Sequence, residues 1–210
     1  MLKHGFIILA SVLLCGCMQN RQLSNTADTT LYETNIADTI GEKPVAPQRL
    51  IVAGQGIGNI SINEDADSVY NKLGKPDSSK AVMNKSVASW VTKHGGVNYQ
   101  TQIYCERRMG SDTAARRVKQ IRVTSPGFKT MDYMGVGMHL QTIMPKKEFN
   151  LIKIGQYTEG NKQFFVYDDA DAGIAFEVDR KNMCTGVIVH EPHYIIESTY
   201  LAFHTNLPGD

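Results

Sequence analysis

The sequence is poor in the features that mark membrane-spanning and nucleic-acid-binding proteins. Its longest apolar run, Phe6 to Leu14, is too short to cross a bilayer as a helix. Cysteine occurs only four times in 210 residues, and two of the four lie at the end of that run. Basic residues number 22 and acidic residues 21, and Lys3 of the leader accounts for the difference. This balance argues against a dedicated polyanion binder, so we expect no nucleic-acid partner.

Motifs for nucleotide and calcium binding are incomplete. A glycine-rich stretch, Gly54 to Asn59, follows an apolar strand, but Asn59 stands where the dinucleotide fingerprint needs its third glycine. The segment from Asp169 to Gly173 begins like a calcium loop, yet Arg180 occupies the position that needs a glutamate. A hairpin turn between two strands is the better interpretation of that segment.

Motifs for zinc and for hydrolysis are absent as well. His190 and His193 are separated by Pro192, which interrupts any helix that would bring both rings to one face. No serine, cysteine or carboxylate pair stands in a recognisable hydrolase context such as a nucleophile elbow. We therefore expect no metal, no cofactor and no catalytic residue, although a site assembled across the fold stays open.

The N-terminus has the pattern of a secretory signal, with a basic start, an apolar run and small residues. The run ends in Leu14-Cys15-Gly16-Cys17, which resembles the lipobox of bacterial lipoproteins. The resemblance implies a signal peptide over residues 1–17 and a lipid such as palmitate on Cys17. The alternative is an ordinary cleaved signal followed by an unmodified cysteine. An anchor with more than one acyl chain holds firmly, because each buried methylene contributes about 0.8 kcal/mol.

The residues after Cys17 predict a location and a spacer. No aspartate follows at the position that resembles an inner-membrane retention signal, so we expect an outer-membrane lipoprotein facing the periplasm or the cell surface. Residues 18–48 are rich in Asn, Thr, Asp, Ser and Gln and have no sustained apolar period. Such a segment cannot bury enough surface to fold, so we interpret it as a disordered tether.

Two cysteines remain in the mature chain, Cys105 and Cys184. An exported protein lives where disulfides form, so these two can be bonded to each other. Both are also flanked by strand-like sequence, where a free thiol packs as a small apolar group. The sequence leaves both alternatives open, because it does not supply the Cα separation that decides between them.

The remainder predicts two similar units, residues 49–125 and 126–192, followed by a tail over residues 193–210 that packs on the domain. The motif Gly56-Ile57-Gly58 opens the first unit and Gly135-Val136-Gly137 opens the second. A helical segment follows each motif. In the first unit the helix starts with Asn63 as N-cap and ends at Gly74, and in the second it ends before Gly155.

Three strand-like runs follow each predicted helix, at 87–91, 99–105 and 118–123 in the first unit and at 163–167, 173–178 and 186–189 in the second. The predicted fold class is α+β, with two tandem repeats. Each repeat is a helical segment followed by a three- or four-stranded antiparallel sheet, and the repeats share one continuous sheet.

The segment from Ser61 to Asp77 contains Leu73-Gly74-Lys75-Pro76 just before its last residue. It resembles the helix-closing motif of the small lipoprotein of the outer-membrane barrel-assembly machinery, in which an acidic residue and an aliphatic stripe precede a final Leu-Gly-x-Pro. The tandem order resembles the beta-lactamase-inhibitor-like fold. The resemblance implies helix-plus-sheet repeats and the inhibition of a periplasmic enzyme as one alternative function.

Two groups of residues are candidates for binding a partner. Alternation along 99–105 puts Gln102 and Tyr104 on the opposite strand face from Ile103. Aromatic residues on an open sheet face are common anchors of protein interfaces, and a basic loop over 106–117 suits an anionic partner. The full candidate set is Trp90, Gln102, Tyr104, Arg107, Arg108, Arg116, Arg117, Phe165 and Tyr167.

These observations predict a non-enzymatic cell-envelope lipoprotein that binds another protein or an envelope component. Its expected partners are the membrane, through the lipid anchor, and a protein of the envelope. The alternatives are an envelope hydrolase with a site assembled across strands and an inhibitor of a periplasmic enzyme.

Overall fold

The computed structural model describes residues 43–107, 115–146, 148–194 and 203. The predictions for the leader, Cys17, the tether up to residue 42, Arg108 and most of the 193–210 tail fall outside these residues. The described part belongs to one compact unit that begins at Lys43. No helix in it is long and apolar enough to cross a membrane.

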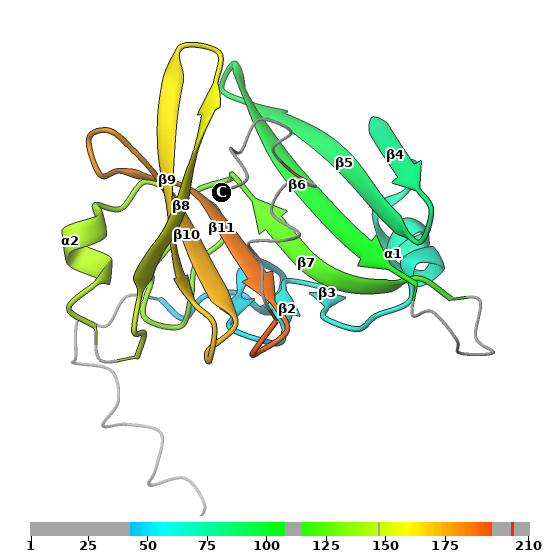
Figure 1. The fold of residues 1–210 in the computed structure, drawn as a ribbon, viewed down its shortest axis with the longest axis horizontal. Coiled ribbons are helices and arrows are strands. Elements are labelled where there is room, and N and C mark those ends of the chain that lie inside the picture. The colour runs from blue at the N-terminus through cyan, green and yellow to red at the C-terminus, as the bar shows by residue number, and fades with distance from the viewer. Residues whose placement is uncertain (1–42, 108–114, 147, 195–202, 204–210) are drawn as a thin grey trace, which may run out of the picture. The chain divides into compact units, whose positions relative to one another are not determined.

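An antiparallel sheet of eight strands dominates the described fold, in the order β4-β5-β6-β7-β11-β10-β9-β8 (Figure 1). Neighbours in sequence lie side by side from β4 to β7 and again from β8 to β11, and β7 pairs with β11 at the centre. The strands are β4 (Ser78–Val82), β5 (Lys85–His94), β6 (Val97–Glu106), β7 (Arg117–Val123), β8 (Ile152–Glu159), β9 (Lys162–Asp169), β10 (Ile174–Asp179) and β11 (Cys184–His190).

The glycine-rich stretch near the start of the unit forms a second, three-stranded sheet. A 3-10 turn, η1 (Pro47–Arg49), leads into β1 (Ile51–Val52), β2 (Gly56–Ile57) and β3 (Ile60–Ser61). A Cβ on Gly56 would lie 2.2 Å from the carbonyl oxygen of Ile60, so only glycine fits this close approach. The glycines therefore serve a tight backbone meander.

Two short α-helices are present in the described residues, α1 (Ala66–Leu73) and α2 (Leu140–Ile143). The Asp65 side chain caps α1 by accepting a hydrogen bond from the Asp67 backbone N–H, and Gly74 ends the helix. Asn63, the predicted cap, instead has a left-handed backbone with φ of 64°. The helix exists as predicted, but it begins two residues later than the predicted cap implies.

The predicted fold class, α+β with helix-plus-sheet tandem repeats, is wrong. The described protein is mostly β, with an eight-stranded and a three-stranded sheet and helices of only eight and four residues. The main error is the predicted second helix, because residues 152–159 form β8 and pair with β9. A short apolar run fits a strand as well as a helix, and pairing with β9 supplies the backbone with hydrogen-bond partners.

The two faces of the large sheet differ in chemistry. One face carries the main apolar core, which includes Ile103, Val123, Phe176 and Val187 and also takes up residues of the small sheet and both helices. The opposite face carries a smaller apolar cluster around Ile188. Tyr194 and Phe203, from the tail, pack against that smaller cluster.

A buried ion pair lies on this opposite face. Arg122 of β7 donates from Nε to both Glu177 carboxylate oxygens at 2.9 Å, and its Nη2 lies 2.6 Å from Oε2. The side chains are 6% and 0% exposed. Arg122 also donates through Nη1 to the side-chain oxygen of Gln102 at 2.7 Å. The pair reaches across β11 at Gly186, where a Cβ would stand 2.2 Å from the carboxylate.

We predict that breaking this pair from one side is costly. Arg122→Met or Glu177→Gln should each lower the free energy of unfolding by about 3–5 kcal/mol, because the remaining partner stays buried without its counterpart. The double variant Arg122→Met/Glu177→Leu should lose less than the sum of the two single losses. Urea unfolding at neutral pH measures all three values.

The exposed pair of Arg117 and Asp65, 3.8 Å apart, provides the control. Arg117→Met should change the free energy of unfolding by less than about 1 kcal/mol, as is usual for surface pairs. An equally small loss for Arg122→Met would contradict a structural role for the buried pair.

Candidate binding surfaces

The aromatic residues predicted for an open sheet face do not lie there. Trp90, Phe165 and Tyr167 are half-buried and pack against the main core. Tyr104 lies on the opposite face but is only 1% exposed. Burial, with the nearby Glu106 carboxylate, raises the pKa of Tyr104 to about 12. Core packing therefore accounts for the described positions of these four side chains.

Cys105 and Cys184 are free and buried. Cys105 pairs with Val118 at the start of β7, whereas β11 meets β7 from Val187 opposite Val123 onward. The register thus puts the two cysteines at opposite ends of β7, too far apart for the Cα separation of about 4.4–6.8 Å that a disulfide needs. The disulfide alternative is incorrect for this structure.

The histidine pair of the sequence does not form a metal site. His190 is fully buried, with Nε2 2.9 Å from Asp168 Oδ1 and Nδ1 2.9 Å from the Glu191 carbonyl oxygen. His193 is exposed and lies 3.1 Å from Asp171. Among the residues that the structure describes, no group of three or more His, Cys, Asp or Glu side chains is placed to hold a metal. His190 uses both ring nitrogens in structural contacts.

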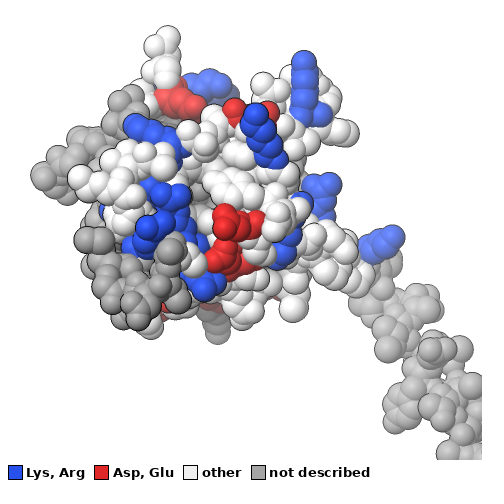
Figure 2. All heavy atoms as spheres, turned by 90° about the vertical axis from the view of Figure 1, so that its right-hand side faces the viewer, with Lys and Arg blue, Asp and Glu red and all other residues white. Residues whose placement is uncertain are grey.

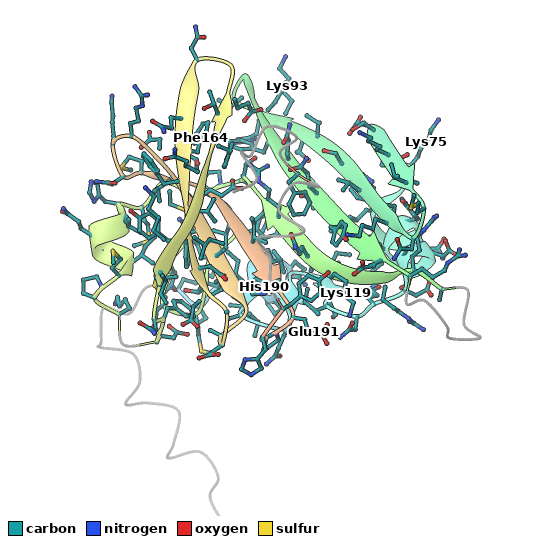
Figure 3. The ribbon with its side chains drawn as sticks, in the orientation of Figure 1. Lys75, Lys93, Lys119, Phe164, His190 and Glu191 are labelled. Atoms are coloured by element: carbon teal, nitrogen blue, oxygen red, sulfur yellow. The ribbon has the colours of Figure 1, made fainter. Side chains whose placement is uncertain are left out.

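The described basic residues of the predicted set, together with the neighbouring Lys119, form two groups. Arg117 pairs with Asp65, and Lys119 donates to Glu191 at 2.7 Å, near His190 at the lower end of the sheet (Figure 3). Arg107 and Arg116 instead line a cavity of about 330 Å³ beside the N-terminus of α1. Its polar lining residues are Asp65, Asp67, Tyr70, Ser86, Arg107 and Arg116.

Three hydrogen bonds fix the backbone of the two arginines of the cavity. The Arg107 N–H donates to the Asn84 carbonyl at 2.8 Å, and the Asn84 side chain donates to the Arg107 carbonyl at 3.3 Å. The Arg116 carbonyl accepts from the Ala66 N–H at 2.9 Å. The cavity is therefore positioned by two elements, the β4–β5 turn and the start of α1.

β4 lies at one edge of the large sheet. Among the described strands β4 pairs only with β5, and all five of its residues are exposed. Apolar side chains accompany it, because Val82 is 55% exposed and Met83, in the turn that follows, is 93% exposed. Val91 of β5 is 42% exposed. An uncovered edge with exposed apolar residues is a template for an added strand.

Lysines lie on and beyond this edge, and Asp77 precedes it with its carboxylate accepting from the Val91 N–H at 2.7 Å. Lys80 lies within β4, Lys75 precedes it, and Lys93 lies at the far end of β5 (Figure 3). In the described part of the chain none of these three lysines makes an ion pair, whereas Lys85 lies 3.9 Å from Glu106. Figure 2 views this side of the molecule and shows Lys and Arg spread around a smaller acidic group.

The sequence reasoning missed the β4 edge and the buried charged network. A signal for the network was present, because Gln120 and Arg122 alternate with Ile121 and Val123 in a strand that is central. Alternating polar residues in a central strand indicate a polar face. The signal for β4 was weak, because Ser78 to Val82 has neither a strong apolar run nor a strong β-former pattern.

Comparisons with known proteins do not identify a family. No protein-family model matches the chain, and no curated protein matches it. Among solved structures it is similar to an extracellular protein containing an SCP domain from Bacillus anthracis str. Ames, with a TM-score of 0.39 and 10% sequence identity. The match covers 75% of this chain and 51% of that one, so this chain spans about half of that structure's length.

We predict that both thiols resist modification in the folded protein. Burial raises the pKa of Cys105 and of Cys184 to about 12, so little thiolate is present at neutral pH. Iodoacetamide should leave both thiols unmodified in buffer and modify both in denaturant without reductant. Mass spectrometry reads the added mass, and failure to label in denaturant without reductant would instead indicate a disulfide.

Proposed function

We propose that this protein is a non-enzymatic cell-envelope lipoprotein whose folded unit binds a partner protein by strand addition at β4. The carrying observation is the β4 edge, where all five residues are exposed and the outer side of the strand is unpaired within the described fold. Backbone hydrogen bonds to an added strand supply affinity, and neighbouring side chains supply selectivity.

The charge of the edge selects the kind of partner. Lys80 stands at the middle of β4, Lys75 precedes the strand, and Lys93 lies beyond it at the far end of β5. Pairing β4 with the same strand of a second copy would bring lysines together, and like charges on neighbouring strands destabilise a sheet. An extended acidic segment of another protein would instead pair favourably with these lysines.

The exposed apolar residues complete the surface. Val82 and Met83 at the turn, and Val91 on β5, offer contacts for apolar side chains of an added strand. The partner that fits is therefore an extended segment in which acidic residues accompany a few apolar ones. Lipidation at Cys17 and a tether would place this edge at a membrane surface and leave it free to reach its partner.

If the lipid is attached through the Cys17 sulfur, membrane association should depend on that one atom. Cys17→Ser should move the protein from the membrane fraction to the aqueous fraction, because serine cannot form the thioether that carries the lipid. Detergent partitioning and mass measurement of the mature N-terminus check this outcome. Equal membrane recovery of the Cys17→Ser protein would contradict the anchor.

The edge predicts a site-specific crosslink to a partner. A photoreactive residue at Ser79, in the full-length protein in native membranes, should capture a partner through an acidic, extended peptide identified by mass spectrometry. Lys80→Glu should weaken this capture about fivefold, since one ion pair contributes about 0.2–1 kcal/mol and charge reversal adds repulsion. The capture yield of Lys80→Gln should fall between those of the wild-type protein and Lys80→Glu.

Lys162 provides the matched control, because it is exposed at the turn between β8 and β9. A photoreactive residue at Lys162 should not capture the same partner, and Lys162→Glu should leave capture at Ser79 unchanged. Equal capture from both positions, or capture at Ser79 that ignores the charge of residue 80, would remove the β4 edge from the proposal.

A further inference from the structure

The cavity beside α1 contains charges that the described protein only partly neutralises. Asp65 accepts the Asp67 backbone N–H at 2.9 Å and lies 3.8 Å from Arg117. The Asp65 carboxylate therefore already has a donor and a cation. Arg107, Arg116 and the Asp67 carboxylate remain as lining charges without an ion pair within the described residues.

Arg116 carries the strongest indication of a missing partner. Its Nε is buried, and no hydrogen-bond acceptor for it exists in the described part of the chain. A buried guanidinium N–H without an acceptor costs free energy, and a planar carboxylate is the acceptor that fits a guanidinium best. The Arg116 backbone is held by Ala66, so the side chain belongs to a fixed wall of the cavity.

Two residues with hydroxyl groups line the same cavity as Arg116. The hydroxyls of Ser86 and Tyr70 line the same cavity, and Ser86 is 8% exposed. Burial raises the pKa of Tyr70, so its hydroxyl stays protonated and can donate at neutral pH. Two guanidinium groups and two hydroxyls thus surround a space suited to an anionic oxygen pair.

Asp67 restricts the class of ligand that can supply this anionic group. Asp67 lines the same cavity as the arginines and carries the opposite charge. A ligand that is only anionic would therefore be repelled by its carboxylate. A ligand that is only cationic would meet two arginines. A molecule that carries both a carboxylate and an ammonium satisfies both signs, and a volume of about 330 Å³ accommodates an amino acid or a short peptide.

We propose that this cavity binds a small zwitterion of the amino-acid or short-peptide class, with its carboxylate on Arg116 and Arg107 and its ammonium on Asp67. This site is separate from the β4 edge, so it stands or falls independently of the proposed partner binding. The Asn84 contacts with Arg107 place the two surfaces at either side of one turn.

Calorimetric titration of the folded protein with three probes tests the assignment. Glycylglycine carries both charges, N-acetylglycine lacks the ammonium, and glycinamide lacks the carboxylate. Glycylglycine should bind saturably at one site, and each of the other two should bind at least about tenfold more weakly, as expected when a charge-assisted contact is lost. Saturation by N-acetylglycine with equal affinity would overturn the zwitterion assignment.

Variants locate the binding within the cavity. Arg116→Ala and Arg107→Ala should each weaken glycylglycine binding about tenfold. Asp67→Asn should weaken glycylglycine but not N-acetylglycine. Arg107 is exposed, so its variant tests the site even if Arg116→Ala is unstable, and thermal unfolding shows which variants remain folded. Arg180, exposed at the β10–β11 turn, is the matched control, and Arg180→Ala should bind normally.

Two results would end the proposal. One is the absence of saturable glycylglycine binding by the wild-type protein. The other is saturable binding that Arg116→Ala and Arg107→Ala, both folded, leave unchanged, since the ligand would then occupy another surface.

Discussion

The central strands depend on the buried contact between Arg122 and Glu177. It joins β7 to β10 across β11, and its geometry requires that Gly186 lie between them without a side chain. Burial raises the pKa of Tyr157, whose ring lies on the same face, so a neutral hydroxyl faces the charged pair. A one-residue slip of β11 would put a threonine or a valine where glycine is needed. We infer that the pair fixes the register as well as contributing to stability.

The central strands and the edge of the sheet therefore have different roles. Around β7, β10 and β11 nearly every side chain is buried, so substitution there acts first on folding. At β4 every residue is exposed, and at the start of α1 the arginine and aspartate side chains line a cavity. Both candidate surfaces lie on the β4–β7 half, where contacts with a partner or ligand do not compete with the core.

Local patterns predicted the local elements, and long-range contacts decided the rest. The six predicted strand runs coincide with β5, β6, β7, β9, β10 and β11, apart from Gly173, which precedes β10, because their β-branched and aromatic residues fit a pleated surface. The run at 151–154 has no decisive period, so its sequence fits a helix as well as a strand. Pairing with β9, which the local sequence does not show, makes residues 152–154 part of a strand. Tyr104 was expected on an open surface, but no local feature shows that Tyr194 and the second cluster cover that face.

The open edges of the large sheet also have a consequence for assembly. Within the described residues the sheet has one unpaired edge at β4 and another at β8, so copies whose edges match would extend it from molecule to molecule. Lys80 in β4 and Lys153 in β8 put positive charge on both edges. These charges oppose edge-to-edge pairing between copies of the chain without closing the sheet into a barrel.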